Sequence, residues 1–153
     1  MSRSVAKDLE PPENSVMVSI WTPNTTNFTA RGAPFFRFRW ESFLSIDFYD
    51  TEFGNETYPP ITEEQGKIIF DFVMLHKDKD ILCVHCDAGI SRSAAVAIFF
   101  AEMWEIPYMD RLDRRVPHTQ KFESTLYKVS EYPHGNSAVK KELTKAYLET
   151  LQL

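Results

Sequence analysis

The chain is poor in the residues and patterns that mark several common classes of protein. Its 153 residues include 2 cysteines and 5 glycines, which excludes a disulfide-stapled mini-protein and a collagen-like fibre. No apolar run approaches the ~18 residues of a membrane-spanning helix, and the polar residues 1–14 lack the apolar stretch of a signal peptide. Acidic residues outnumber basic ones, and a net charge of −5 argues against a general nucleic-acid binder. We therefore expect neither a membrane nor a nucleic acid among its partners.

The chain does contain enough apolar material for a core. Hydrophobic residues make up 43% of it, with 12 Phe, 6 Tyr and 3 Trp, and its length corresponds to one domain. We expect residues 1–14 to be a flexible lead-in and residues 15–153 to form a single domain. Cys83 and Cys86 are too close in sequence to join distant parts of the chain, so a reducing, cytoplasmic compartment is expected.

The hydrophobic pattern predicts an α/β fold with a central, mostly parallel, twisted sheet flanked by helices. The nearly all-apolar run Ile81–His85 is typical of a strand buried on both faces of such a sheet. Thr62 followed by Gln65 forms a capping box that predicts the start of a helix. The predicted strands are residues 16–21, 35–40, 43–48 and 81–85; the predicted helices begin near residues 62 and 91 and span about 119–131 and 137–151.

The segment HCDAGISRS, residues 85–93, links this buried strand to an Ala-rich helix. Such a turn directs backbone N–H groups and the positive end of the helix dipole at one spot, which binds an anion of the phosphate or sulfate type. Arg92 can add a two-pronged contact to the anion, and Gly89 lets the backbone approach it closely. The same positive field favours the thiolate of Cys86, a nucleophile, to which the Ser93 hydroxyl can donate. The predicted phosphate-binding residues are Asp87, Ala88, Gly89, Ile90, Ser91 and Arg92.

This segment resembles the signature of the cysteine-dependent protein tyrosine phosphatases, His-Cys-x5-Arg-Ser/Thr, at His85, Cys86, Arg92 and Ser93. Its letters AG and SRS look most like the dual-specificity branch. The resemblance implies a phosphatase-type loop and hydrolysis of phosphotyrosine, with phosphoserine or phosphothreonine as further substrates, in proteins or peptides. It also implies a phosphocysteine intermediate and an orienting role for His85. No metal or other cofactor is expected, because the loop supplies the positive charge.

Enzymes of this family take a general acid, an Asp, from an upstream loop. Asp50 and Asp47 are the candidates in this chain. The separation of Asp50 from Cys86 is similar to that in relatives, and residues 48–53 (FYDTEF) resemble the acid loop of some dual-specificity phosphatases. Asp47 falls within an alternating strand, so Asp50 is the preferred acid.

Other interpretations of the segment stay open at this point. An RNA 5′-phosphatase or another non-protein phosphatase of the superfamily would use the same loop, and a phospho-binding module would hold phosphate without turnover. Cys83 is expected to be a buried small side chain, with a thiol that traps oxidised Cys86 as the alternative. Residues 114–122 resemble the stretch that joins two C-terminal helices in the family, but His118 stands where relatives often carry an Asn that bonds the phosphate loop.

Overall fold

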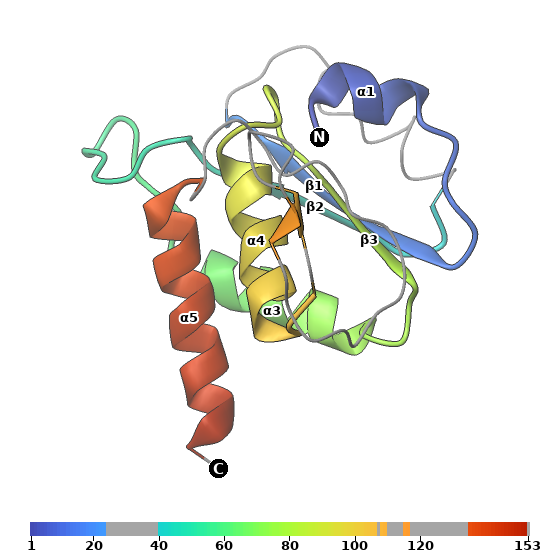
Figure 1. Cartoon of the computed structure of the whole chain (residues 1–153). Coiled ribbons are helices and arrows are strands. Elements are labelled where there is room, and N and C mark those ends of the chain that lie inside the picture. Colours follow the sequence, from blue (N-terminus) through green and yellow to red (C-terminus); the bar gives the residue numbers. More distant parts are fainter. Residues whose placement is uncertain (24–39, 107, 110–114, 117–134, 153) are drawn as a thin grey trace.

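A parallel sheet of three strands, in the order β2-β1-β3, lies at the centre of the structure (Figure 1). The computed structural model describes residues 1–23, 40–106, 108–109, 115–116 and 135–152. A second, two-stranded antiparallel sheet pairs β4 with β5. The strands are β1 (Ser15–Trp21), β2 (Phe43–Asp47), β3 (Ile81–His85), β4 (Tyr108–Met109) and β5 (Arg115–Val116); the helices are α1 (Arg3–Asp8), α3 (Glu63–Leu75), α4 (Arg92–Met103) and α5 (Ser137–Leu151).

Strand β1 is the middle strand, and all 7 of its residues are buried. Because side chains alternate along a strand, Val18 and Ile20 enter one core cluster while Met17 enters another on the opposite face. The register pairs Ser19 of β1 with His85 of β3. Parallel strands end at the same edge of a sheet, so the segments that follow β2 and β3 begin near each other.

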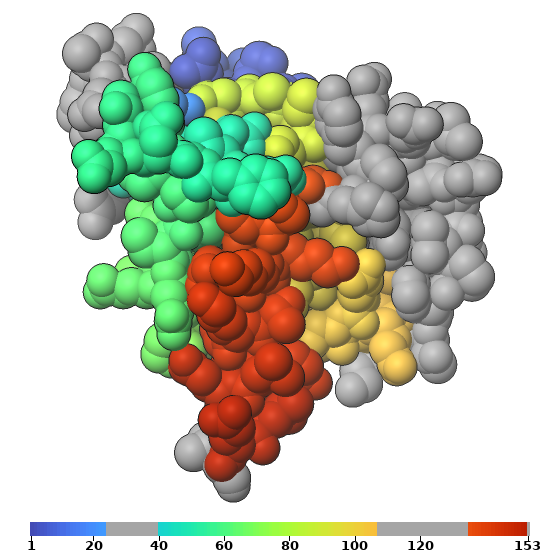
Figure 2. Space-filling view, turned by 90° about the vertical axis from the view of Figure 1, so that its left-hand side faces the viewer, coloured from blue at the N-terminus to red at the C-terminus, as the bar shows by residue number. Residues whose placement is uncertain are grey.

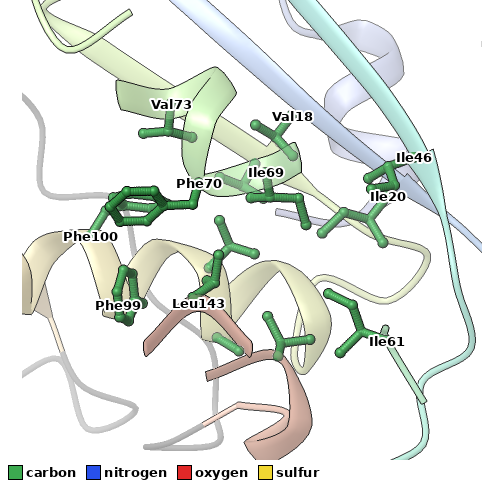
Figure 3. Close-up of a cluster of buried hydrophobic side chains, with 14 of the residues drawn as sticks. Val18, Ile20, Ile46, Ile61, Ile69, Phe70, Val73, Phe99, Phe100 and Leu143 are labelled. Atoms are coloured by element: carbon green, nitrogen blue, oxygen red, sulfur yellow. The ribbon is translucent and has the colours of Figure 1, made fainter. Parts of the chain in front are cut away.

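Helices α3, α4 and α5 cover one face of the sheet, and α1 lies over the other (Figure 1). Figure 3 shows the larger core, in which Phe70 of α3 meets Phe100 of α4, with Leu143 of α5 close by. Fully burying such side chains contributes about 1.5–3 kcal/mol each. This packing fixes the start of α4 relative to the end of β3, and so holds both ends of the loop between them.

Most of the predicted elements that fall on described residues are confirmed. The structure has strands at Ser15–Trp21, Phe43–Asp47 and Ile81–His85 and a last helix at Ser137–Leu151. Thr62 and Gln65 form the predicted capping box. The predicted helix at residues 119–131, and the predicted strand at 35–40 apart from its last residue, lie outside the described residues. No helix in the described ranges is long and apolar enough to cross a membrane.

Residues 1–14 contain helix α1, where the polar composition predicts a flexible lead-in. Ser2 caps the helix with its side chain, and Ala6 is 1% exposed in a cluster with Met17 and Trp21. Leu9 packs against the same cluster. These few apolar side chains cover the sheet face that α3, α4 and α5 leave open.

Candidate functional site

Residues 86–91, which we name the β3–α4 loop, fold back over the sulfur of Cys86. The Gly89 N–H donates to Cys86 Sγ at 3.2 Å, and Ser93 Oγ lies 3.2 Å from the same sulfur. Gly89 has a φ of +76°, a conformation that favours glycine. The loop and the first turn of α4 therefore each direct one hydrogen-bonding group at the buried thiol.

These contacts change the acidity of Cys86, which is 2% exposed. Burial raises the pKa of the thiol, but the hydrogen bonds from Ser93 and Gly89 and the charge of Arg92 lower the pKa by more, so that it lies below its usual value. The lower pKa increases the thiolate fraction at neutral pH. The thiolate is the form that attacks electrophiles.

Arg92, the first residue of α4, is 4% exposed, although arginine is rarely fully buried. Its Nη1 donates to the Phe48 carbonyl at 2.7 Å, and its Nη2 donates to Thr22 Oγ1 at 3.2 Å. Its buried Nε has no hydrogen-bond partner among the described residues. An unsatisfied buried donor costs about 1–3 kcal/mol, and an oxyanion beside the loop would supply the acceptor.

The Asp87 side chain lies against the guanidinium of Arg92. Its Oδ2 is 3.2 Å from Arg92 Nη2 and also accepts the Thr22 hydroxyl. The sequence predicts that the backbone N–H of Asp87 donates to phosphate. The structure adds a carboxylate that holds one end of the Arg92 guanidinium in place.

The start of α4 receives no side-chain cap, although Ser91 occupies the N-cap position. The Ser91 hydroxyl instead donates to Asp50 Oδ1 at 2.7 Å. The first-turn N–H groups of a 12-residue helix therefore keep their partial positive charge at the loop. This arrangement is the one expected of an anion-binding helix N-terminus.

Asp50 follows β2 and reaches the β3–α4 loop through Ser91. Asp47 is exposed on β2, and its backbone carbonyl accepts the side-chain amide of Gln65 at 2.9 Å. Of the two candidate acids, Asp50 is the one that is hydrogen-bonded to the loop among the described residues. In Figure 2 the segment after β2, coloured cyan to green, lies against the start of α5 in red.

Asn136 joins this site, and the sequence pattern does not single it out. It is 1% exposed, and its Nδ2 donates to Asp50 Oδ1 at 2.8 Å and to the Thr51 carbonyl at 3.2 Å. Its backbone N–H donates to the Ser91 carbonyl at 3.1 Å, while its Oδ1 caps α5. One residue thus ties the candidate acid to the loop and to α5. The position of Asn before a predicted helix is the only signal that could have found it.

His85 lies on the opposite face of β3 from Cys86 and is fully buried. Its Nε2 is 2.5 Å from Ser19 Oγ, and its Nδ1 is 3.3 Å from the Cys86 carbonyl oxygen. Burial lowers the pKa of His85 to about 4, so the ring is neutral at pH 7. These contacts agree with an orienting role.

The remaining predicted residues fall into three groups: Cys83, two residues of the β3–α4 loop, and a segment that lies mostly outside the described residues. Cys83 is 1% exposed in the cluster under α1, as expected of a buried small side chain, and forms no disulfide. Ala88 and Ile90 lie in the β3–α4 loop, exposed and half-buried respectively. His118 and most of residues 114–122 lie outside the described residues.

Comparison of the chain with family models, with curated proteins and with solved structures finds no match. Within the described ranges, no cluster of three or more His, Cys, Asp or Glu side chains could hold a metal ion. The chemistry of the site therefore rests on the loop residues and their contacts.

Proposed function

We propose that the protein is a cysteine-dependent phosphomonoester hydrolase of the dual-specificity phosphatase type. Its substrates are phosphotyrosine, and phosphoserine or phosphothreonine, in proteins or peptides. The observation that carries the proposal is the pairing of Cys86, whose thiol pKa is lowered, with the buried Nε of Arg92, which has no acceptor in the part of the chain that the structure describes. A nucleophile and an oxyanion-binding cation meet there at the start of one helix.

In the first step the Cys86 thiolate attacks phosphorus, and the bond from phosphorus to the leaving oxygen breaks. Asp50 in its protonated form gives a proton to that oxygen. Arg92 and the loop N–H groups hold the other phosphate oxygens. The product is a phosphocysteine and a free hydroxyl on the substrate.

In the second step water attacks phosphorus, and the Asp50 carboxylate takes the proton that the water loses. The bond between phosphorus and sulfur breaks, which releases inorganic phosphate and the Cys86 thiolate. The Ser93 hydroxyl, 3.2 Å from the sulfur, stabilises the departing thiolate. Neither step changes an oxidation state, and a reducing cytoplasm would keep Cys86 competent.

The test is hydrolysis of a phosphotyrosine peptide in the presence of EDTA. Cys86→Ser should abolish turnover while retaining affinity for inorganic phosphate. On the phosphotyrosine peptide, Asp50→Ala should lower kcat by a factor of about 10²–10⁴ with little change in KM. The loss of kcat should be smaller on p-nitrophenyl phosphate, because its leaving group needs less protonation. Asp47→Ala is the matched control and should stay near wild type.

Two results would contradict the proposal. A wild-type protein that binds inorganic phosphate but hydrolyses neither substrate would be a phospho-binding module. A larger loss of kcat in Asp47→Ala than in Asp50→Ala would move the acid to Asp47.

A further inference from the structure

The first three residues of the chain run alongside the β3–α4 loop. The Cys86 N–H donates to the Met1 carbonyl at 3.3 Å, and the Arg3 N–H donates to the Asp87 carbonyl at 3.2 Å. Ser2 and Cys86 form an isolated parallel bridge. The segment thus bonds two consecutive residues at the point where β3 becomes the loop.

The contact is backbone against backbone, which makes it close. A Cβ on Gly89 would lie 2.3 Å from the Ser2 nitrogen and 2.4 Å from the Met1 carbonyl carbon. Glycine at this position is therefore required by the N-terminal segment as well as by its positive φ. We name residues 1–3 the N-terminal clamp.

The hydrogen bond from Arg3 bears on the direction of one loop N–H group, that of Ala88. No peptide bond among the described residues is cis, and in a trans peptide the C=O and the N–H point in opposite directions. The Arg3 bond draws the Asp87 carbonyl toward the clamp, so the N–H of the next residue, Ala88, points to the other side. The following N–H, that of Gly89, donates to the Cys86 sulfur.

We propose that the N-terminal clamp positions the β3–α4 loop for anion binding, with the backbone N–H of Arg3 as the positioning group. This inference rests on the proposed function and assigns part of the site to a segment outside the signature. The Arg3 side chain contributes little by comparison. Its ion pair with Asp87 spans 3.8 Å between side chains that are 46% and 33% exposed, and such pairs are weak.

Arg3→Pro tests the clamp because it removes this N–H and leaves the helix intact. Arg3 is the first residue of α1, a position where proline is well tolerated. Ser2 has φ −77° and ψ 163°, the extended conformation that a residue before proline prefers. Arg3→Ala is the matched control, since it loses the same side chain but keeps the N–H.

Two readouts are measured for each variant: the affinity for inorganic phosphate by calorimetry, and the rate of Cys86 alkylation by iodoacetamide across pH. We expect Arg3→Pro to bind phosphate about five-fold more weakly than Arg3→Ala, the effect of one lost hydrogen bond, and to be alkylated more slowly at pH 6. The thermal unfolding temperature of Arg3→Pro should be lower than that of Arg3→Ala by only about 2–4 °C, the effect of the same lost hydrogen bond on stability. Equal phosphate affinity and equal alkylation profiles would overturn the clamp.

Hydrogen exchange on the wild type keeps the test valid if Arg3→Pro fails to fold. The Arg3 N–H should exchange more slowly than that of Ser4, its neighbour in the same helical turn, and saturating phosphate should slow it further. Exchange of Arg3 as fast as that of Ser4, with and without phosphate, would contradict the inference. Absence of hydrolysis by wild type with these effects present would refute the proposed function but not the clamp.

Discussion

Replacing Asn136 by Asp tests how the candidate acid is held. The substitution keeps the size of the side chain and keeps an oxygen that caps α5. It removes the Nδ2 donor that bonds Asp50 and the Thr51 carbonyl. It also places a second carboxylate beside that of Asp50.

These contacts determine how much the substitution lowers the free energy of unfolding. Two lost hydrogen bonds cost about 0.5–1.5 kcal/mol each. Two carboxylates ~4 Å apart repel by about 1 kcal/mol in water and about 4 kcal/mol at an effective dielectric constant of 20; because Asp50 is exposed, the lower part of that range applies. The new negative charge at the start of α5 interacts favourably with the helix dipole, which stabilises the variant by about 0.3–1 kcal/mol. The net loss is about 1–4 kcal/mol of the free energy of unfolding.

Urea unfolding at pH 7 and pH 4 measures this loss, with Asn136→Ser as the matched control. Serine can still cap the helix but loses the amide donor and adds no charge. Proton uptake by either carboxylate removes the repulsion, so the folded Asp variant binds a proton more readily than the unfolded chain. Its deficit relative to the Ser variant should therefore shrink as the pH falls.

Equal free energies of unfolding for the Asp and Ser variants at pH 7, or a difference between them that does not change with pH, would refute the prediction. Either result would mean that Asn136 and Asp50 are not adjacent in the protein. The link between the candidate acid, the β3–α4 loop and α5 would then have to be abandoned.

Two further predictions concern the Cys86 thiol and the buried ring of His85. Ser93→Ala removes a hydrogen bond to Cys86 Sγ and should raise the pKa of that thiol. The rate at which iodoacetamide alkylates Cys86 at pH 6 should then fall about tenfold. In the control Ser91→Ala, which loses a hydroxyl that bonds Asp50, Cys86 should be alkylated at the wild-type rate. For His85, burial lowers the pKa from 6.5 to about 4, so the unfolded chain takes up the proton first as the pH falls. The free energy of unfolding of the wild type should decrease by up to about 3 kcal/mol between pH 6.5 and 4 through this group. Urea unfolding of His85→Gln should show a smaller decrease over the same pH range. An equal decrease in the two proteins would show that His85 is not buried as a neutral ring.

The features that the sequence predicts correctly depend on residues close together in the chain. The apolar composition of the run Ile81–His85 predicts that it is a buried strand. The capping box is equally local, because Thr62 and Gln65 are three residues apart on one helical turn. Cys86 and Arg92 come together because one strand, one turn and one helix follow in order. Such local signals determine the elements and the centre of the site.

The features that the sequence does not predict depend on contacts between distant segments. Asn136 meets Asp50 across 86 positions of sequence, and no periodicity or motif marks such a pair. The N-terminal residues reach Val84 and Cys86 from the far end of the chain, and their polar composition gives no sign of it. Strand order in the sheet is likewise decided by tertiary packing and not by the pattern of any one strand.

The alternation of side chains along β3 has a consequence for oxidative damage. Cys83 lies in the cluster under α1, whereas Cys86 belongs to the core on the other face. Residues three apart on a strand are separated by about 10 Å, beyond the ~7 Å limit for a disulfide between two Cα atoms. The chain has no third cysteine, so a sulfenic acid formed on Cys86 by peroxide would find no thiol of its own molecule within reach. Recovery would depend on thiols supplied from solution, and the reducing capacity of the surroundings would set how long Cys86 stays oxidised.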